Sequence, residues 1–445
     1  MANFAKPSAP RFTVEVHQNA FLPEGGRDVH AIVTVTSTGG ATATRSVGRD
    51  AAVVIMVDCS GSMEYPPDKM RGAREATAAA VDTLRDGTSF AVIAGTHVAR
   101  EVYPGQGRLA VAGPETRAQA KEALRGLRSG GGTAIGTWLR LADGLLRRSP
   151  AAIRHGVLLT DGRNEHEDPA VLRATLDACA GRFTCDARGV GTDWEVKEVT
   201  GVASALLGSA DIVADPAHLT EDFTRMMENV MGKEVADVSL RLWTPVGVEI
   251  QYVKQVAPTV QDLTGRRTAA GPRAGDYPTG SWGDESREYH VCVRVPGGAV
   301  GQEMLAARAT LVLPDPVGAG GPAGGPPDPL SQGLVRAVWT DDPAASTSIS
   351  PQVAHYTGQA ELAQAIQQGL EARKLGDVDG ATARLGRAVQ LASASGNADT
   401  ARLLAKVVDV VDAAAGTVRL KAKVADADEM TLETRSTQTV RVKKT

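Results

Sequence analysis

The segment that most constrains the fold is 51–62, AAVVIMVDCSGS. Its first seven residues are apolar and four of them are β-branched, a run too short to span a membrane and typical of a strand buried on both faces of a parallel sheet. Asp58 ends the run, and Ser60 and Ser62 follow at alternate positions. Because open α/β sheets place their ligand sites at the carboxyl ends of strands, we expect a carboxylate and two hydroxyls to converge here. Three small oxygen donors favour a hard cation such as Mg²⁺.

Two later segments supply donors that this site still lacks. Mg²⁺ prefers about six oxygens and tends to keep water and a partner group among them. Gly130–Thr133, GGGT, places a hydroxyl at the start of a helical pattern, and His155–Asp161, HGVLLTD, is a second buried-strand pattern that ends on an aspartate. The candidate metal ligands are therefore Asp58, Ser60, Ser62, Thr133 and Asp161. The alternative is that the serines cap a helix and that the aspartate merely ends a strand.

In chain order, Asp58-x-Ser60-x-Ser62, Thr133 and Asp161 resemble the metal-ion-dependent adhesion site of von Willebrand factor A domains, the family that includes integrin inserted domains. The resemblance covers roughly 51–232. It implies that the two serines and the threonine touch the metal directly and that the aspartates act mostly through water. It also implies Mg²⁺, with Mn²⁺ or Ca²⁺ as alternatives, and a partner protein whose Asp or Glu is the last ligand.

The function expected from this resemblance is a metal-dependent protein-binding scaffold and not an enzyme. Bacterial relatives are often encoded beside protein kinases, phosphatases or AAA+ ATPases, so the partner is expected in a system of that kind. The alternative is a Mg²⁺-dependent phosphatase-like hydrolase with Asp58 as nucleophile, because haloacid-dehalogenase phosphatases also begin with an Asp after the first strand. Those enzymes need a second Asp two residues on, where this chain has Ser60.

Composition narrows the classes of partner and the compartment. The chain has 445 residues, 42% of them hydrophobic, which predicts two to four domains with real cores. A net charge of −4 argues against nucleic acid and anionic membranes as partners. The N-terminal residues MANFAKPSAPRF have no apolar signal core, so a cytoplasmic location is expected. The four cysteines are expected to be buried free thiols, although Cys179 and Cys185 are near enough in sequence to pair.

The region 50–233 alternates strand and helix patterns, as a doubly wound, Rossmann-like α/β sheet requires. Helices are predicted at 69–84, 115–127, 135–148, 169–179, 194–207 and 216–231, and further strands at 89–94, 156–160, 185–190 and 210–213. Val98–Tyr103 is predicted to be an antiparallel edge strand. Several polar loop residues at the same sheet end either select the partner or are simply solvated, namely Glu64, Tyr65, Arg163, Asn164, Glu165 and His166. His166 is not expected to bind the metal, because Mg²⁺ avoids imidazole.

Short alternating segments lie on both sides of this region. Two precede it, at 11–18 and 29–37, and five follow it, at 235–243, 246–256, 287–295, 303–313 and 333–339. Such strands predict an antiparallel β-sandwich built from 10–48 plus 235–350, into which the α/β domain is inserted. The alternative is two unrelated β-segments. Pro314–Pro329, rich in Gly and Pro, is predicted to be a flexible loop.

The C-terminal part is predicted to be a small α-helical domain followed by a tail. Small and apolar residues in 355–416 resemble one tetratricopeptide repeat plus a capping helix at Thr400–Ala415. By composition, 417–445 should stay mobile unless one short strand pairs with the sandwich. Thr437 and Thr439 each have a valine three residues on, which resembles the phosphothreonine motif that forkhead-associated domains read. The tail is therefore either a phospho-switch for such a reader or an ordinary polar tail.

Overall fold

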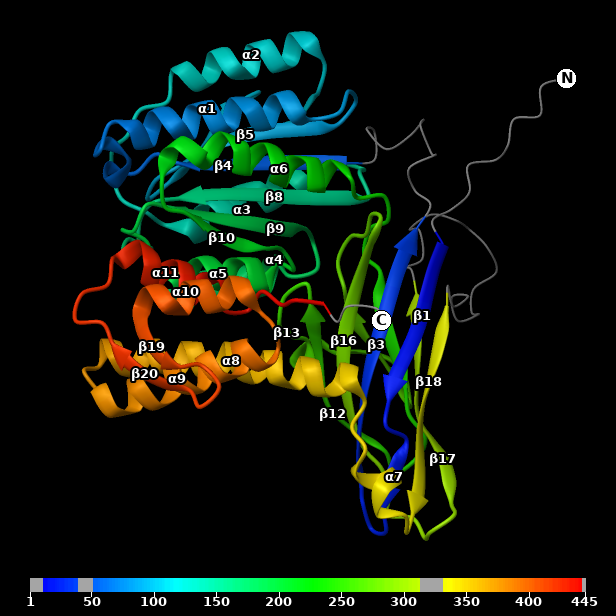
Figure 1. Cartoon of the computed structure of the whole chain (residues 1–445). Coiled ribbons are helices and arrows are strands. Elements are labelled where there is room, and N and C mark those ends of the chain that lie inside the picture. Colours follow the sequence, from blue (N-terminus) through cyan, green and yellow to red (C-terminus); the bar gives the residue numbers. More distant parts are fainter. Residues whose placement is uncertain (1–10, 39–50, 313–330, 442–445) are drawn as a thin grey trace, which may run out of the picture. The chain divides into compact units, whose positions relative to one another are not determined.

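The computed structural model describes residues 11–38, 51–312 and 331–441. It separates into two compact units, shown in Figure 1. Of the described residues, 51–236 form one unit, which we call the α/β domain. Residues 11–38, 237–312 and 331–441 form the other, which we call the sandwich unit. The predicted flexible loop Pro314–Pro329 lies outside the described residues.

The sheet of the α/β domain is built around β4 (Ala51–Asp58), every residue of which is buried. The strand order is β10-β9-β8-β4-β5-β6, and β7 also pairs with β5. β4 is parallel to both of its neighbours, and only β6 and β7 run antiparallel to β5. The other strands are β5 (Ser89–Gly95), β6 (Ala99–Tyr103), β7 (Ala110–Val111), β8 (Ile153–Thr160), β9 (Thr184–Val190) and β10 (Ala210–Val213). The central buried strand and the antiparallel edge strand that the sequence predicts are thus confirmed.

Helices cover both faces of this sheet. Figure 1 shows α1 and α6 on one face, where Val53, Ile55 and Val57 of β4 join their core, and α3, α4 and α5 on the other. The helices are α1 (Asp68–Thr83), α2 (Pro114–Arg125), α3 (Ile135–Leu146), α4 (Pro169–Cys179), α5 (Val196–Ala205) and α6 (Leu219–Met231), with short 3₁₀ turns η2 (Gly61–Glu64) and η3 (Pro216–His218). This doubly wound arrangement brings the loops after β4, β8 and β9 to one edge of the sheet.

The sandwich unit has two sheets that combine strands from both sides of the α/β domain. One sheet has the order β1-β3-β16-β12-β13 and the other β14-β15-β11-β17-β18-β2. β3 (Asp28–Thr38) pairs with β16 (Glu285–Arg294) over ten positions, so the α/β domain is inserted into the sandwich chain, as predicted. The remaining strands are β1 (Arg11–Gln18), β2 (Phe21–Pro23), β11 (Ser239–Trp243), β12 (Glu249–Ala257), β13 (Gln261–Asp262), β14 (Thr268–Gly271), β15 (Ala274–Pro278), β17 (Glu303–Val312) and β18 (Gln332–Thr340).

The two sheets pack closely at β1 and β18. Gly333 of β18 faces Val14 and Val16 of β1, and a Cβ on Gly333 would lie 2.5 Å from a methyl carbon of Val16. Glycine is therefore required there by the close approach of the sheets. Within the described residues of this unit, β2 and β18 are the only parallel pair of strands.

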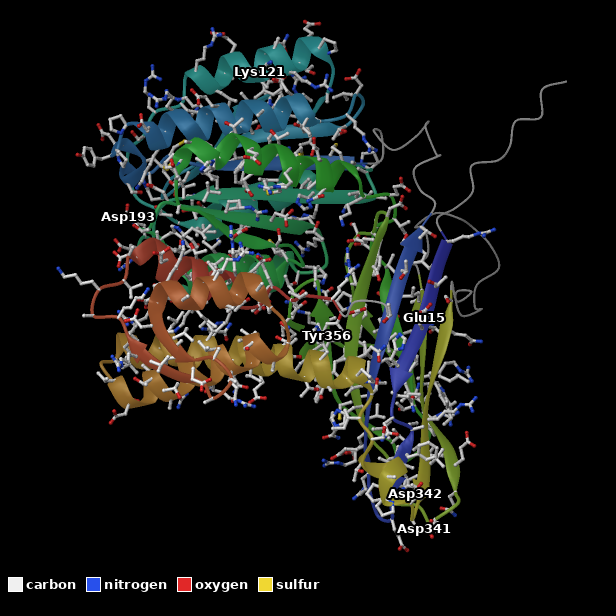
Figure 2. All side chains as sticks on the ribbon, in the orientation of Figure 1. Glu15, Lys121, Asp193, Asp341, Asp342 and Tyr356 are labelled. Atoms are coloured by element: carbon white, nitrogen blue, oxygen red, sulfur yellow. The ribbon has the colours of Figure 1, made fainter. Side chains whose placement is uncertain are left out.

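The helical part of the sandwich unit consists of α7 (Pro343–Thr347), α8 (Pro351–Lys374), α9 (Val378–Ala394), α10 (Ala398–Val407) and α11 (Asp426–Arg435), with a hairpin of β19 (Val408–Asp412) and β20 (Thr417–Leu420). Tyr356 of α8 is fully buried against Ile32 and Val256 of the sandwich, and its position is shown in Figure 2. The predicted capping helix Thr400–Ala415 is wrong beyond Val407. The run VVDVV at 407–411 is rich in β-branched residues, which favour the hairpin over continued helix.

The prediction that 417–445 is mobile is also wrong for the part that the structure describes, while its exception, a short pairing with the sandwich, is met by the antiparallel bridge between Thr259 and Gln438. β20 and α11 lie in this segment, and Leu432 of α11 is fully buried in the helical core. Further on, the backbone of the tail bonds to the turn after β12, with Val260 N donating to Thr437 O at 2.8 Å and Thr439 N donating to Pro258 O at 3.0 Å. One buried leucine and these backbone hydrogen bonds order a segment that has few apolar residues. Across the described ranges, no helix combines the length and apolarity needed to cross a membrane.

Candidate metal centre

Asp58 lies at the carboxyl end of β4 and is fully buried. Its Oδ1 accepts a hydrogen bond from the backbone N–H of Ser60 at 2.8 Å, and its Oδ2 accepts one from the hydroxyl of Thr160 at 2.6 Å. Burial raises the pKa of Asp58 to about 6, although the hydrogen bonds from Ser60 and Thr160 act in the opposite direction. Asp58 therefore holds the loop that follows β4, and its own charge is costly there without a nearby cation.

Asp161 follows β8, the neighbour of β4, and is equally buried. Its Oδ1 accepts a hydrogen bond from Ser62 Oγ at 2.7 Å, and the hydroxyl oxygens of Ser62 and Ser60 are 2.9 Å apart. The second aspartate thus reaches the serine pair from the adjacent strand. Two carboxylates and two hydroxyls meet at one end of the sheet, as the sequence predicts.

Thr133 is brought to the same place by hydrogen bonds between two loops. Gly61 N donates to Gly131 O and Gly130 N donates to Cys59 O, both at 2.8 Å. Gly131 has a φ of +82°, a conformation that a residue with a side chain rarely adopts. The glycines of the GGGT motif therefore allow the threonine loop to lie directly on the serine loop.

Gly162 shows where the three hydroxyls converge. A Cβ on Gly162 would lie 3.1 Å from Ser62 Oγ, 3.1 Å from Thr133 Oγ1 and 3.7 Å from Ser60 Oγ. The three oxygens therefore converge on one point beside Gly162, which only a residue without a side chain leaves free. Asp58 and Asp161 contact the two serines from behind this point, so all five residues singled out from the sequence lie close together.

The donor set fits a hard cation. It offers three hydroxyl oxygens backed by two carboxylates, and oxygen ligands of this kind are those that Mg²⁺ and Ca²⁺ prefer. Among the described residues, no group of three or more His, Cys, Asp and Glu side chains is arranged to hold a metal ion. The chemistry of the site therefore rests on its hydroxyls and not on imidazole or thiolate. All four cysteines are buried and free, as expected.

Some of the polar loop residues have structural roles. Asn164 is buried, and its Oδ1 accepts a hydrogen bond from Ile135 N at 2.7 Å, at the first residue of α3. Glu167 Oε2 accepts one from the next N–H, that of Gly136, at 2.8 Å. These side chains cap the helix that begins after the threonine loop. Asn164 therefore does not point to a partner, whereas Tyr65 is 81% exposed beside the serine loop.

One charged residue of the site was not predicted from the sequence. Lys69, in the first turn of α1, is 4% exposed, and its Nζ lies 2.8 Å from Asp161 Oδ2 and 2.8 Å from Asp193 Oδ2. Burial lowers the pKa of this lysine, but its hydrogen bonds to Asp161 and Asp193 outweigh burial and raise the pKa above the ordinary value. A lysine at a helix start is usually solvated. The sequence signal for this contact is limited to Asp161 and Asp193, which follow the neighbouring strands β8 and β9.

Comparisons with known proteins agree with this architecture. The family model of the von Willebrand factor type A domain matches residues 51–212, and that of the von Willebrand factor type A C-terminal domain matches residues 390–436. A solved structure, the von Willebrand factor type A protein from Catenulispora acidiphila, is 52% identical, with 97% of this chain and 98% of that chain covered and a TM-score of 0.90. The chain belongs to the von Willebrand factor type A family.

A more distant solved structure shares the fold of this family member. The ArnB paralog VWA2 from Sulfolobus acidocaldarius is 14% identical, with a TM-score of 0.59 over 96% of this chain and 98% of that chain. The search of curated proteins found no match. The second family model begins in α9 and ends just after α11, so the C-terminal helices and hairpin are a part of the family architecture. The resemblance to a tetratricopeptide repeat stays a prediction.

Proposed function

We propose that the α/β domain binds a divalent cation, Mg²⁺ with Mn²⁺ or Ca²⁺ as alternatives, in a metal-ion-dependent adhesion site, and that the site captures an Asp or Glu side chain of a partner protein. The observation that carries this proposal is the convergence of three hydroxyls on the space beside Gly162. Ser60, Ser62 and Thr133 would hold the ion directly, and the two carboxylates would act from behind them. A bound Mg²⁺ supplies an electropositive centre with room for a carboxylate oxygen.

The charge distribution supports a binding role. The three hydroxyls are neutral, and the two carboxylates already accept hydrogen bonds on both of their oxygens. Neutral direct ligands leave most of the charge of a divalent ion uncompensated, which favours an anionic group from outside. The partner that this chemistry selects is a protein with an exposed acidic side chain. We place that partner in a kinase, phosphatase or AAA+ ATPase system, in line with the resemblance described above.

The geometry of Asp58 argues against the hydrolase alternative. A nucleophilic carboxylate needs an oxygen that faces the substrate, whereas Asp58 is fully buried and both of its oxygens accept hydrogen bonds. Ser60 stands where a phosphatase of that class has its second aspartate. A phosphatase assay with Mg²⁺ separates the two functions, because a binding protein gives no turnover.

Calorimetric titration with MgCl₂ tests the metal site directly. Wild type should bind Mg²⁺, and Asp58→Asn should lose about 100-fold or more in affinity, since it removes a charge beside the ion. Asp82→Asn, which alters a surface ion pair with Lys121, is the matched control and should bind as wild type does. A pull-down in Mg²⁺, repeated with a chelator and with Asp58→Ala, then tests partner capture. Partner binding that survives the chelator would contradict the proposal.

A further inference from the structure

Lys69 is a buried cation that contacts the candidate metal site through Asp161. Its ammonium group lies between the carboxylates of Asp161, which is fully buried, and Asp193, which is 64% exposed, at 2.8 Å from each. Taking an ammonium group out of water is costly unless it is paired and hydrogen-bonded. Both conditions are met here, so the fold maintains a positive charge directly beside a residue of the metal site.

The loop after β9 holds this cation in place. Gly191 has a φ of +67°, and a Cβ there would lie 3.5 Å from Cε of Lys69, so this loop passes alongside the lysine. Trp194 is buried, and its indole N–H donates to Gly191 O at 3.0 Å. The buried tryptophan anchors the loop that carries Asp193, which Figure 2 shows at the edge of the domain where the parallel strands end.

Asp161 is consequently fixed from two sides. Ser62 donates to its Oδ1 and Lys69 donates to its Oδ2. The carboxylate is therefore oriented by the protein before any cation binds. Preorganisation of this kind keeps the hydroxyl of Ser62 at its position in the site.

The charge of Lys69 has opposite effects on the two ligands of the proposed site. An ammonium group beside Asp161 repels a divalent cation and attracts a carboxylate. We propose that Lys69 is a positioning residue that holds Asp161 in place, weakens metal binding and strengthens capture of the acidic side chain. This inference rests on the proposed function and assigns to one residue the balance between metal and partner.

Titration of Mg²⁺ alone into a set of variants tests the inference. Lys69→Met should bind Mg²⁺ about tenfold more tightly than wild type, because the repulsion is gone. At saturating Mg²⁺ the same variant should bind immobilised poly-glutamate about tenfold more weakly. A lysine with only a structural role would give weaker binding of both ligands after removal, and that result would overturn the inference. Lys69→Arg keeps the charge and should remain close to wild type in both measurements.

The variant Asp193→Asn tests the same inference while the buried lysine stays in place. It removes the exposed partner of Lys69, so it should weaken Mg²⁺ binding by a few-fold, the opposite sign to Lys69→Met. Tighter Mg²⁺ binding by Asp193→Asn would overturn the inference. Lys121→Met, on the outer helix α2 (Figure 2), is the matched control for loss of a lysine and should change neither measurement.

Two further results separate failure of this inference from failure of the proposed function. A wild-type protein that binds no Mg²⁺ overturns the proposed function and the metal balance together, whereas a wild type that binds Mg²⁺ with the affinity of Lys69→Met overturns the inference alone. Melting in a chelator tests the ion pair by itself. Lys69→Met should melt lower than wild type because Asp161 is left buried without its cation, and adding Asp161→Asn should recover most of the loss.

Discussion

Two polar clusters, one in each unit, show how differently a protein can accommodate buried and half-buried polar side chains. In the α/β domain the cluster is formed by two carboxylates, three hydroxyls and Lys69. In the sandwich unit it is formed by His30, Tyr252 and His290, with 3.2 Å between each pair of their facing polar atoms. Burial raises the pKa of Asp58 to about 6, and burial lowers the pKa of His290 to about 4. Both shifts disfavour the charged form, yet they have different consequences at neutral pH.

The histidine cluster satisfies itself. Burial lowers the pKa of His30 and of His290 below the usual value, so both side chains stay neutral at pH 7. His30 contributes Nδ1 and His290 contributes Nε2, so one of these nitrogens can donate and the other accept, while the hydroxyl of Tyr252 can do both. No excess of charge is left among these three groups at neutral pH.

The carboxylate cluster has acceptors and negative charge in excess. Asp58 and Asp161 carry two negative charges when ionised, and the buried cation Lys69 pairs with Asp161 and with the more exposed Asp193. The hydroxyls that converge beside Gly162 still have lone pairs to offer. An excess of buried negative charge next to converging hydroxyl oxygens is what a cation neutralises. Burial therefore does not distinguish the two clusters, whereas an excess of negative charge beside hydroxyl oxygens does.

The two units can be tested apart, and this experiment has the largest expected effect. A fragment of 50–233 contains the whole parallel sheet and its helices, so it should melt cooperatively and keep Mg²⁺ binding. Deletion of 11–38 from the full chain should unfold the sandwich, because β3 lies inside its sheet between β1 and β16. Circular dichroism and proteolysis report both results. A fragment beginning at 235 that folds fully without 11–38 would contradict the shared sandwich.

Adding a methyl group at Gly162 should lower Mg²⁺ affinity more than adding one at any other glycine. Gly162→Ala places a Cβ 3.1 Å from the hydroxyls of Ser62 and Thr133, closer than ordinary contacts. We expect a loss of about 100-fold in Mg²⁺ affinity, comparable to the loss of a ligand-supporting residue. Gly144→Ala in α3 is the control, since a Cβ there meets nothing within 4 Å. Titration calorimetry of both variants measures the difference, and equal affinities would show that the space is not the metal site.

Much of this site was predictable because it lies in local patterns. The apolar run of β4 and the polar residues at its end specify a central strand with a site at its carboxyl end, and the second strand pattern ends on Asp161 in the same way. The common edge then follows from the parallel topology. The pairing of flanking strands was likewise visible as alternation on both sides of the domain.

The parts that escaped prediction depend on contacts distant in sequence. Lys69 and Asp161 are 92 positions apart, and no local pattern distinguishes this lysine from a solvated one. Asn164 caps a helix that begins 29 residues earlier. The tail beyond 417 is ordered by Leu432 and by backbone hydrogen bonds to the turn after β12, and composition does not encode either. The composition of the tail describes only the apolar residues of the tail itself. The surface on which the tail packs is supplied by the rest of the unit.

The two clusters should respond to pH with opposite signs. In the α/β domain without metal, the folded pKa of Asp58, about 6, exceeds its ordinary value of 3.8. The folded state therefore binds the proton more tightly, and stability rises as pH falls from 7 toward 5, by about 1 kcal/mol. In the sandwich unit the folded pKa of His290, about 4, lies below 6.5. Stability there is lost over the same interval, by about 2 kcal/mol.

Denaturant unfolding in a chelator at pH 7 and pH 5 measures these responses, with the 50–233 fragment reporting on the α/β domain alone. Asp58→Asn should remove the gain in the α/β domain, and His290→Gln should reduce the loss in the sandwich unit. If both units become less stable on acidification, the contrast between the clusters is wrong. A response of the correct sign that survives its own substitution would assign the proton to another group.

The smallest expected effect concerns the tail, which belongs to the sandwich unit and should leave the metal site unchanged. Thr439 donates its hydroxyl to Val256 O at 2.7 Å and its N–H to Pro258 O at 3.0 Å. Thr439→Val removes the first bond and should lower the free energy of unfolding by about 1 kcal/mol. Thr437→Val is the control, because Thr437 bonds to Val260 through its backbone carbonyl. Mg²⁺ affinity should be the same in wild type and both variants.

The hydrogen bond from Thr439 to Val256 also determines how the predicted phospho-switch could operate. The Thr439 hydroxyl is engaged in the docked tail, and Thr434 and Ser436 are buried, so a kinase needs the tail to detach before it modifies these positions. A phosphate on Thr439 adds nearly two negative charges and cannot donate to the Val256 carbonyl, so it should keep the tail released. Incubation with a serine/threonine kinase, mass spectrometry and hydrogen exchange at Val260 N–H measure this together. Absence of phosphate beyond Asp426, or phosphate on Thr439 with Val260 still protected, would show that the tail is a fixed part of the sandwich unit.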